Sequence, residues 1–193
     1  MFRFFPAGLG FSLLLGTTAI ITLPTNIGDA LVEAVELADG MTAFLVPPQF
    51  VAASTSHSSA SQRHATYFFT IDLPENAGEP LQKVVIAPQN LTRFLRSYRV
   101  QATRAFEGSR FSPGADLSLG SVSEEPETKA VTVVFDRPVS PGRRITIALQ
   151  PQHNPRSSGI YIFRITTFPS GENPQAYIAG HARISITPID IDD

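Results

Sequence analysis

Apolar and polar residues alternate with a period of two along several short segments, and this rhythm constrains the fold more than any other feature. Between residues 67 and 73, alternate positions hold large apolar side chains: Tyr67, Phe69, Ile71 and Leu73. The period recurs over residues 81–87, 131–135, 145–149 and 160–168. It recurs again over 177–186, where we expect four side chains to face the core: Ile178, Ala182, Ile184 and Ile186. Successive side chains of a strand point to opposite faces of the sheet, so these segments are predicted to be strands with one buried face.

Turn-forming residues separate these segments. The chain contains 16 prolines and 13 glycines, and no helical segments alternate with the strands to build parallel units. We therefore predict an all-β fold, an antiparallel, immunoglobulin-like β-sandwich of roughly seven to eight strands. A small β-barrel is the alternative.

The remaining segments are less regular. Residues 41–46 are predicted to be an edge strand that ends at Pro47, and residues 51–64 and 107–126 to be loops, because they show no periodicity. One short helix is predicted over residues 90–98, where apolar side chains recur at helical spacing after a candidate N-cap at Asn90: Leu91, Phe94, Leu95 and Tyr98.

The first residues have the order of a signal peptide. Arg3 supplies a positive charge, an apolar run follows over residues 7–23, and Gly28 and Ala30 are small residues at the expected cleavage positions. The run is shorter than the roughly 20 residues that a spanning helix needs, and an uncleaved N-terminal anchor is the alternative. We predict a signal peptide over 1–30, a single domain over 31–193, and a secreted or periplasmic protein whose membrane contact is only through the signal segment.

Cysteine content and charge exclude several function classes. The chain has no cysteine, which excludes thiol catalysis, thiolate metal sites and a disulfide framework. The formal net charge is -2 at pH 7, whereas a nucleic-acid-binding domain is expected to be basic. We therefore predict no nucleic-acid partner.

Motifs for catalysis are also missing from the sequence. No Gly-x-Ser-x-Gly elbow of a serine hydrolase is present. The acidic residues Glu124, Glu125 and Glu127 lie beside Pro126 in a predicted loop, where we expect them to be solvated rather than to flank a glycosidic bond. We predict that the chain is not an enzyme, and no cofactor is expected.

Arginines and aromatic residues are interleaved between residues 93 and 111, where Glu107 is the only acidic residue. Guanidinium groups beside aromatic rings can bind phosphate, anionic sugars or lipid headgroups. In the alternative interpretation, the arginine stems cover apolar surface while their heads stay in water. The candidate binding residues are Arg93, Arg96, Tyr98, Arg99 and Arg104.

The histidines suggest a second function, that of a periplasmic copper- or zinc-binding protein. His181 is the best candidate ligand, because small neighbours such as Gly180 leave access to it. His153 and His64 are its candidate partners. No pair of histidines has the spacing of a preformed chelate, so the competing interpretation is that they are ordinary surface residues.

Several blocks carry a family resemblance. They are residues 67–82, which read YFFTIDLPENAGEPLQ, residues 103–108, and the pair 133–142 and 159–171. Together they resemble the opening, middle and closing blocks of a family of exported cyanobacterial proteins catalogued only as a domain of unknown function. The resemblance covers about residues 43–186 and implies a signal-bearing β domain without any known activity. Our hypothesis is an exported, non-enzymatic β-sandwich module with a binding or structural role in the cell envelope. Its partner is unknown, with envelope polysaccharide or another envelope protein as candidates.

Overall fold

The computed structural model describes residues 40–90 and 95–189, and the regular secondary structure of this part of the chain consists of β-strands and one short 3-10 helix. Its strands are β1 (Gln49–Thr55), β2 (Tyr67–Leu73), β3 (Leu81–Pro88), β4 (Arg104–Ser109), β5 (Ser112–Leu117), β6 (Leu119–Glu124), β7 (Val131–Val139), β8 (Arg143–Leu149), β9 (Gly159–Pro169) and β10 (Tyr177–Ile186). A short 3-10 helix, η2 (Val100–Ala102), precedes β4. None of the described segments forms an apolar helix long enough to cross a membrane.

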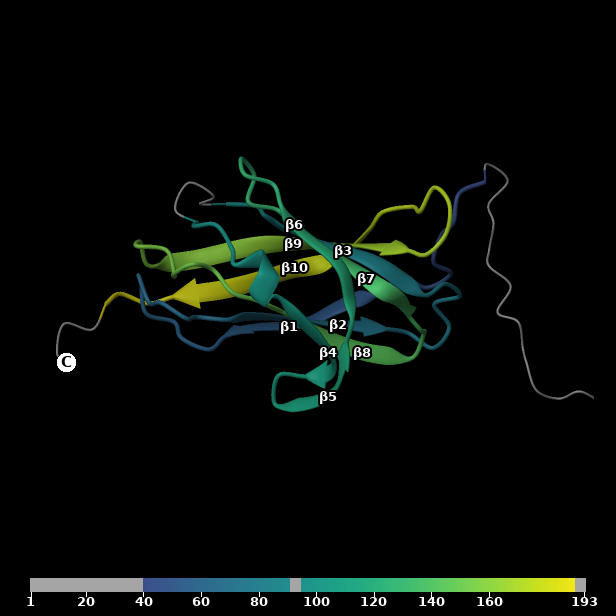
Figure 1. The fold of residues 1–193 in the computed structure, drawn as a ribbon, viewed down its shortest axis with the longest axis horizontal. Helices are drawn as coiled ribbons and strands as arrows, with labels where there is room; N and C mark the ends of the chain where they lie inside the picture. Colours follow the sequence, from purple (N-terminus) through teal and green to yellow (C-terminus); the bar gives the residue numbers. More distant parts are fainter. Residues whose placement is uncertain (1–39, 91–94, 190–193) are drawn as a thin grey trace, which may run out of the picture. The chain divides into compact units, whose positions relative to one another are not determined.

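The strands form two antiparallel sheets that pack face to face (Figure 1). The first sheet has the order β1-β2-β8-β4-β5, and the second sheet has the order β10-β9-β3-β7-β6. The predicted antiparallel, immunoglobulin-like β-sandwich is confirmed. The described residues contain ten strands, more than the seven to eight expected, because three strands lack a hydrophobic rhythm.

The core between the sheets consists of the side chains that the two-residue rhythm singles out. Tyr67, Phe69, Ile71 and Leu73 of β2 are at most 1% exposed. Across the core, the rings of Phe69 and Phe163 meet edge to face with their centroids 5.5 Å apart. Burying one such side chain stabilises the fold by about 1.5–3 kcal/mol, so the alternating strands hold the two sheets together.

The prediction was wrong for the edge of the first sheet. Residues 41–46 form no ladder, and Thr42 makes only an isolated bridge with Pro174. The edge strand is β1, which lies largely within the predicted loop 51–64 and pairs with β2 from Thr55 to Gln49. Most of its side chains are small, so backbone pairing rather than burial defines this strand.

The predicted helix over 90–98 is not formed by the described residues; residues 91–94 lie outside them. The Asn90 side chain makes two hydrogen bonds to the backbone of β9. Its Nδ2 donates to the carbonyl oxygen of Ile160 at 3.0 Å, and its Oδ1 accepts from the amide of Ile162 at 2.8 Å. Leu95 and Tyr98 are buried and lie in an irregular segment, so these two apolar residues contact the core without a helix.

The second predicted loop, 107–126, was also wrong, because it contains β5 and β6. β5 pairs with β4 in the first sheet and β6 pairs with β7 in the second, so the chain crosses between the sheets at Ser118. The Ser118 carbonyl oxygen accepts a 2.9 Å hydrogen bond from the amide of Asp136. Most side chains of the two strands are solvent-exposed, which leaves no alternation to detect.

One core position of β10 was assigned to the wrong face. Ala182, Ile184 and Ile186 are buried as predicted, but Ile178 is 61% exposed. The register with β9 shifts between Ile178 and Gly180. Such a bulge adds one residue to the strand and turns the preceding side chains to the opposite face.

Candidate functional site

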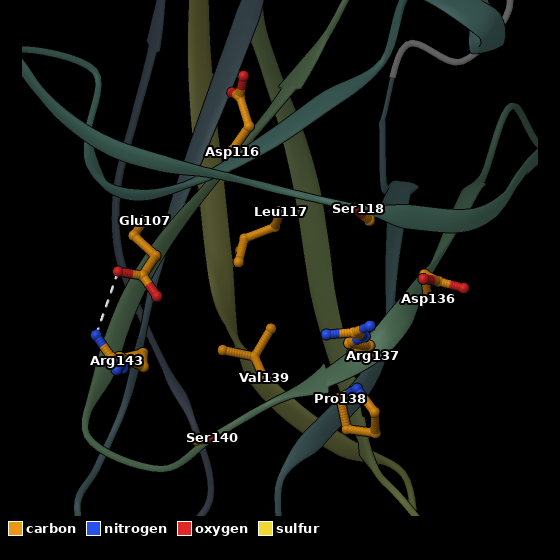
Figure 2. Close-up of a pocket in the computed structure, with 10 residues that line it drawn as sticks. All are labelled: Glu107, Asp116, Leu117, Ser118, Asp136, Arg137, Pro138, Val139, Ser140 and Arg143. Atoms are coloured by element: carbon orange, nitrogen blue, oxygen red, sulfur yellow. Dashed lines mark hydrogen bonds and ion pairs between the residues drawn. The ribbon is translucent and has the colours of Figure 1, made fainter.

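The crossing segment borders a pocket of ≈ 450 Å³, which we call the seam pocket (Figure 2). Its volume lies in the range of about 300–1,000 Å³ that is usual for small-ligand sites. The lining comes from β4, from the crossing between β5 and β6, from the end of β7 and from the start of β8. It is mainly polar, with Leu117 and Val139 as apolar residues between the charged groups.

Glu107 and Arg143 form one side of the pocket. Glu107 lies opposite Ile145 in the β4–β8 ladder, and Arg143 is two residues earlier on β8. Nη1 of Arg143 donates to Oε2 of Glu107 at 3.2 Å. Both side chains are partly exposed, so this pair contributes little stability and serves mainly to orient the carboxylate.

Asp116 is held in a similar way at the upper edge of the pocket in Figure 2. It lies opposite Phe106 in the β4–β5 ladder. Nη2 of Arg104 donates to its two carboxylate oxygens at 2.9 and 3.2 Å. Arg104 therefore orients a second carboxylate of the seam pocket.

A large bulge in β7 supplies the third side. Two steps along β3, from Leu81 to Lys83, correspond to five along β7, from Val139 to Val134. The extra residues turn the side chains of Asp136 and Arg137 into solvent, where they line the pocket. Within residues 40–90 and 95–189, neither side chain has an ion-pair partner.

The pocket thus offers a ligand both hydrogen-bond donors and hydrogen-bond acceptors. The carboxylates are acceptors, the guanidinium groups are donors, and the hydroxyls of Ser118 and Ser140 are both. Its described lining contains no histidine, cysteine or lysine. What the geometry provides is a concave polar surface on which two carboxylates, Glu107 and Asp116, are paired with arginines.

The structure separates the predicted arginine patch. Arg93 lies outside the described residues. Tyr98 is only 6% exposed, so the prediction of a surface role for its ring was wrong: the ring is part of the core. Arg104 is neutralised by Asp116. Arg96 and Arg99 are exposed, and Nη2 of Arg99 makes one long hydrogen bond of 3.4 Å to the carbonyl oxygen of Gln152.

The candidate metal ligands are not brought together. His64 and His153 lie in loops at one end of the sandwich, joined through a bridge between Arg63 and His153. His181 lies within β10, opposite Arg164, five residues before the strand ends. In the described part of the chain, no group of three or more histidine, cysteine, aspartate or glutamate residues is arranged to hold a metal ion.

Sequence reasoning missed Asp136, Arg137 and Arg143. Asp136 and Arg137 fall within residues 136–142, which are predicted to be a turn because they contain Pro138 and a Pro–Gly pair, and Arg143 directly follows this turn. Pro138 was the available signal, since a proline at the end of an alternating strand marks a bulge or an edge.

A family model described as Protein of unknown function (DUF2808) matches residues 41–186. The chain belongs to this family. The match spans all ten described strands and every residue of the seam pocket. The expectation of a family without an assigned activity is therefore confirmed, while export and a cyanobacterial source stay predictions. No curated protein matches the DUF2808 chain.

Several solved structures are similar to this chain. The N-terminal domain of the Streptococcus gordonii adhesin Sgo0707 is 16% identical, with a TM-score of 0.48, over 76% of this chain and 34% of that chain. The C-terminal domain of the Streptococcus pyogenes antigen I/II-family protein AspA is 14% identical, with a TM-score of 0.42, over 71% of this chain and 46% of that chain. ACE19, the collagen-binding subdomain of the Enterococcus faecalis surface protein ACE, is 9% identical, with a TM-score of 0.43, over 72% of this chain and 98% of that chain.

The chain thus spans less than half the length of the two streptococcal proteins. At these identities and TM-scores, the likeness concerns the sandwich fold and gives no argument for a shared ligand.

Proposed function

We propose that this DUF2808 chain is an exported, non-enzymatic binding module of the cell envelope, and that the seam pocket is its ligand site. The observation that carries the proposal is the pair of arginine-held carboxylates, Glu107 with Arg143 and Asp116 with Arg104, at one pocket. Polar groups that are fixed before a ligand arrives lose less freedom on binding.

The mixture of charges indicates the class of ligand. A ligand with a strong charge of either sign would meet like charges on one side of the pocket. A neutral, hydroxyl-rich ligand can donate to the carboxylates and accept from the guanidinium groups at the same time. We therefore propose a saccharide segment of an envelope polysaccharide as the ligand, with Asp136 and Arg137 available to contact it.

The cellular location is part of the proposal. Residues 1–30 would act as a signal peptide and residues 31–193 would form the exported domain, in a secreted or periplasmic protein. The block resemblance supports a cyanobacterial source. N-terminal sequencing of the native protein is expected to begin between Leu31 and Gly40, and native protein that begins at Met1 would contradict cleavage.

The ligand proposal can be tested with neutral oligosaccharides. A glycan array identifies a binding sugar, and calorimetric titration then compares the wild-type chain with a Glu107→Gln, Asp136→Asn variant. We expect at least a tenfold loss of affinity, because two charge-assisted acceptors, each worth about 1.5 kcal/mol or more, are weakened. Asp72→Asn is the matched control, since Asp72 pairs with Arg144 outside the pocket.

Two results would contradict this assignment. One is an array on which no neutral oligosaccharide binds. The other is a binding sugar whose affinity is the same in the pocket variant and in the Asp72→Asn control. In the second case the domain binds saccharide at another surface.

A further inference from the structure

The outer face of the second sheet carries basic, aliphatic and hydroxyl side chains and Phe168, with no carboxylate among the residues that the ladders of β10, β9, β3 and β7 place on it. The register of β10, β9, β3 and β7 defines this face, and its members alternate with the buried core residues. Its basic residues are Lys83, Arg164, His181 and Arg183. Its aliphatic residues are Val85, Val134, Ile160, Ile162 and Ile178. All strands in the described residues belong to the two sheets, so no described strand covers it.

Three of the basic residues, Arg164, His181 and Arg183, form a band across β9 and β10, and Lys83 lies on the same face four residues along the β3–β9 ladder. His181 lies directly opposite Arg164, and Arg183 lies opposite Ile162. Lys83 lies opposite Phe168, with its Nζ 3.9 Å from the centre of the ring. The guanidinium groups of Arg164 and Arg183 are diagonal neighbours on β9 and β10, and their like charges favour an anionic partner that lies against this face.

The aliphatic side chains lie beside this band rather than apart from it. Ile178 is 61% exposed and Ile160 is 42% exposed, and they lie on either side of the basic residues of β9 and β10. The contact surface is therefore amphipathic, with cations between apolar side chains.

We infer that this face docks on an anionic lipid bilayer surface. Its cations would contact phosphate-bearing headgroups, and Ile160 and Ile178 would reach the boundary of the acyl chains. An anionic bilayer offers a partner for both kinds of side chain, because its headgroups attract the cations and its acyl chains accept the aliphatic side chains. The inference goes beyond the saccharide site, which lies at the β5–β6 crossing and not on this face.

Other occupants fit the observations less well. A second copy of the same face would bring like charges together. An anionic polysaccharide would gain nothing from the exposed isoleucines. Protein hot spots are enriched in tryptophan, tyrosine and arginine in well-packed pockets, but the strand register places no tyrosine or tryptophan on this face, and its basic residues do not line the seam pocket.

The test is sedimentation of residues 31–193 with vesicles. Phosphatidylglycerol vesicles are compared with neutral phosphatidylcholine vesicles, at low and high salt. We expect binding to the anionic vesicles only, and we expect it to weaken as salt rises, because the charges are screened. Each basic residue near an anionic surface contributes about fivefold to partitioning. A Lys83→Gln, Arg164→Gln, Arg183→Gln variant should therefore lose more than tenfold.

The control removes the same charge elsewhere. Arg96→Gln, Arg99→Gln, Arg144→Gln eliminates three cations outside the face, Arg144 being on β8 of the first sheet, and should keep wild-type partitioning. Replacing Ile160 and Ile178 by serine should weaken binding even at low salt. Circular dichroism checks that each variant is folded.

Three outcomes overturn the inference. In the first, the wild type does not bind anionic vesicles. If it binds soluble polyglutamate instead, the face recognises an acidic protein partner and not a bilayer. In the second, the control variant loses as much binding as the face variant. In the third, a folded face variant keeps full binding. The saccharide titration is independent of all three, so failure of one proposal is distinguishable from failure of the other.

Discussion

The phenol of Tyr67 donates a 2.9 Å hydrogen bond to the side-chain oxygen of Asn154, and both side chains are at most 1% exposed. Nδ2 of Asn154 donates in turn to the carbonyl oxygens of His57 and Ser59, at 3.0 and 2.9 Å. One buried amide therefore ties the β1–β2 connection to the loop that precedes β9.

This network predicts a large effect of Asn154→Leu, which keeps the approximate size of the side chain but leaves the buried phenol of Tyr67 without its partner and removes one donor from each of two carbonyl oxygens. We expect a loss of about 3 kcal/mol in the free energy of unfolding, against about 1 kcal/mol for Tyr67→Phe. Urea denaturation measures both, and Tyr67→Phe should cost less when it is combined with Asn154→Leu than when it is made alone. An unchanged midpoint for Asn154→Leu would mean that water replaces the network.

The buried tyrosines predict loss of stability at alkaline pH. Burial raises the pKa of Tyr67, Tyr98 and Tyr161 above the ordinary value of 10.0. At a pH between the pKa of a tyrosine in the unfolded chain and its pKa in the folded chain, only the unfolded chain loses the proton. The free energy of unfolding is therefore unaffected below about pH 10 and falls above it, by up to about 1.4 kcal/mol per pH unit for each tyrosine. Denaturation at a series of pH values, with tyrosinate absorbance, measures this. Ionisation near pH 10 with no loss of structure would contradict it.

The pair formed by Lys129 and Glu124 is expected to matter more than other ion pairs. Nζ of Lys129 lies 3.3 Å from Oε1 of Glu124, whose side chain is only 10% exposed, and Oε2 accepts the amide of Tyr98 at 2.7 Å. Lys129→Met would leave a mostly buried carboxylate without its cation. We expect the free energy of unfolding to fall by about 2 kcal/mol, which is less than for a fully buried pair because both side chains keep some contact with water.

The exposed pair Arg144–Asp72 is the control for this prediction. Its side chains are 51% and 45% exposed, so Arg144→Met should cost no more than about 0.5 kcal/mol. Thermal denaturation of the two variants compares them directly. Equal losses would show that the burial of Glu124 does not strengthen its pair.

Gly108 is predicted to be essential to the β4–β5 hairpin. Its φ is +83°, and a Cβ there would collide with the carbonyl oxygen of Ser112. Its own carbonyl oxygen accepts a 2.8 Å hydrogen bond from Oγ1 of Thr146. Gly108→Ala should therefore cost more than about 1 kcal/mol. Gly120→Ala, where a Cβ meets only ordinary contacts from 3.4 Å, should be much milder, and similar midpoints in urea would refute the steric argument.

The predicted site residues fared less well than the fold. The arginine patch was drawn from neighbours in the sequence, but Arg104 pairs with Asp116 on the next strand, and Tyr98 is buried. The seam pocket joins Glu107 of β4 with Arg143 of β8, which are 36 residues apart. Nothing in the local pattern places these two side chains together, because strand order decides which of them become neighbours.

The sequence by itself determined the class of the fold and most of its core. Alternation along the segment 67–73 is enough to identify a buried face, since burial of every second side chain is favourable in any sandwich. Alternation does not identify β1, β5 and β6, because their side chains are mostly small or exposed. These strands are held by backbone hydrogen bonds, which every residue type except proline can make and which therefore leave no pattern in the sequence.

Only the tertiary structure decided what surrounds each surface residue. The bulge near Ile178 placed that side chain on the outer face, and the long bulge in β7 turned Asp136 into the pocket. Both shifts arise from how a strand registers with its neighbour. A register is a property of two segments together, so it cannot be found in either segment alone.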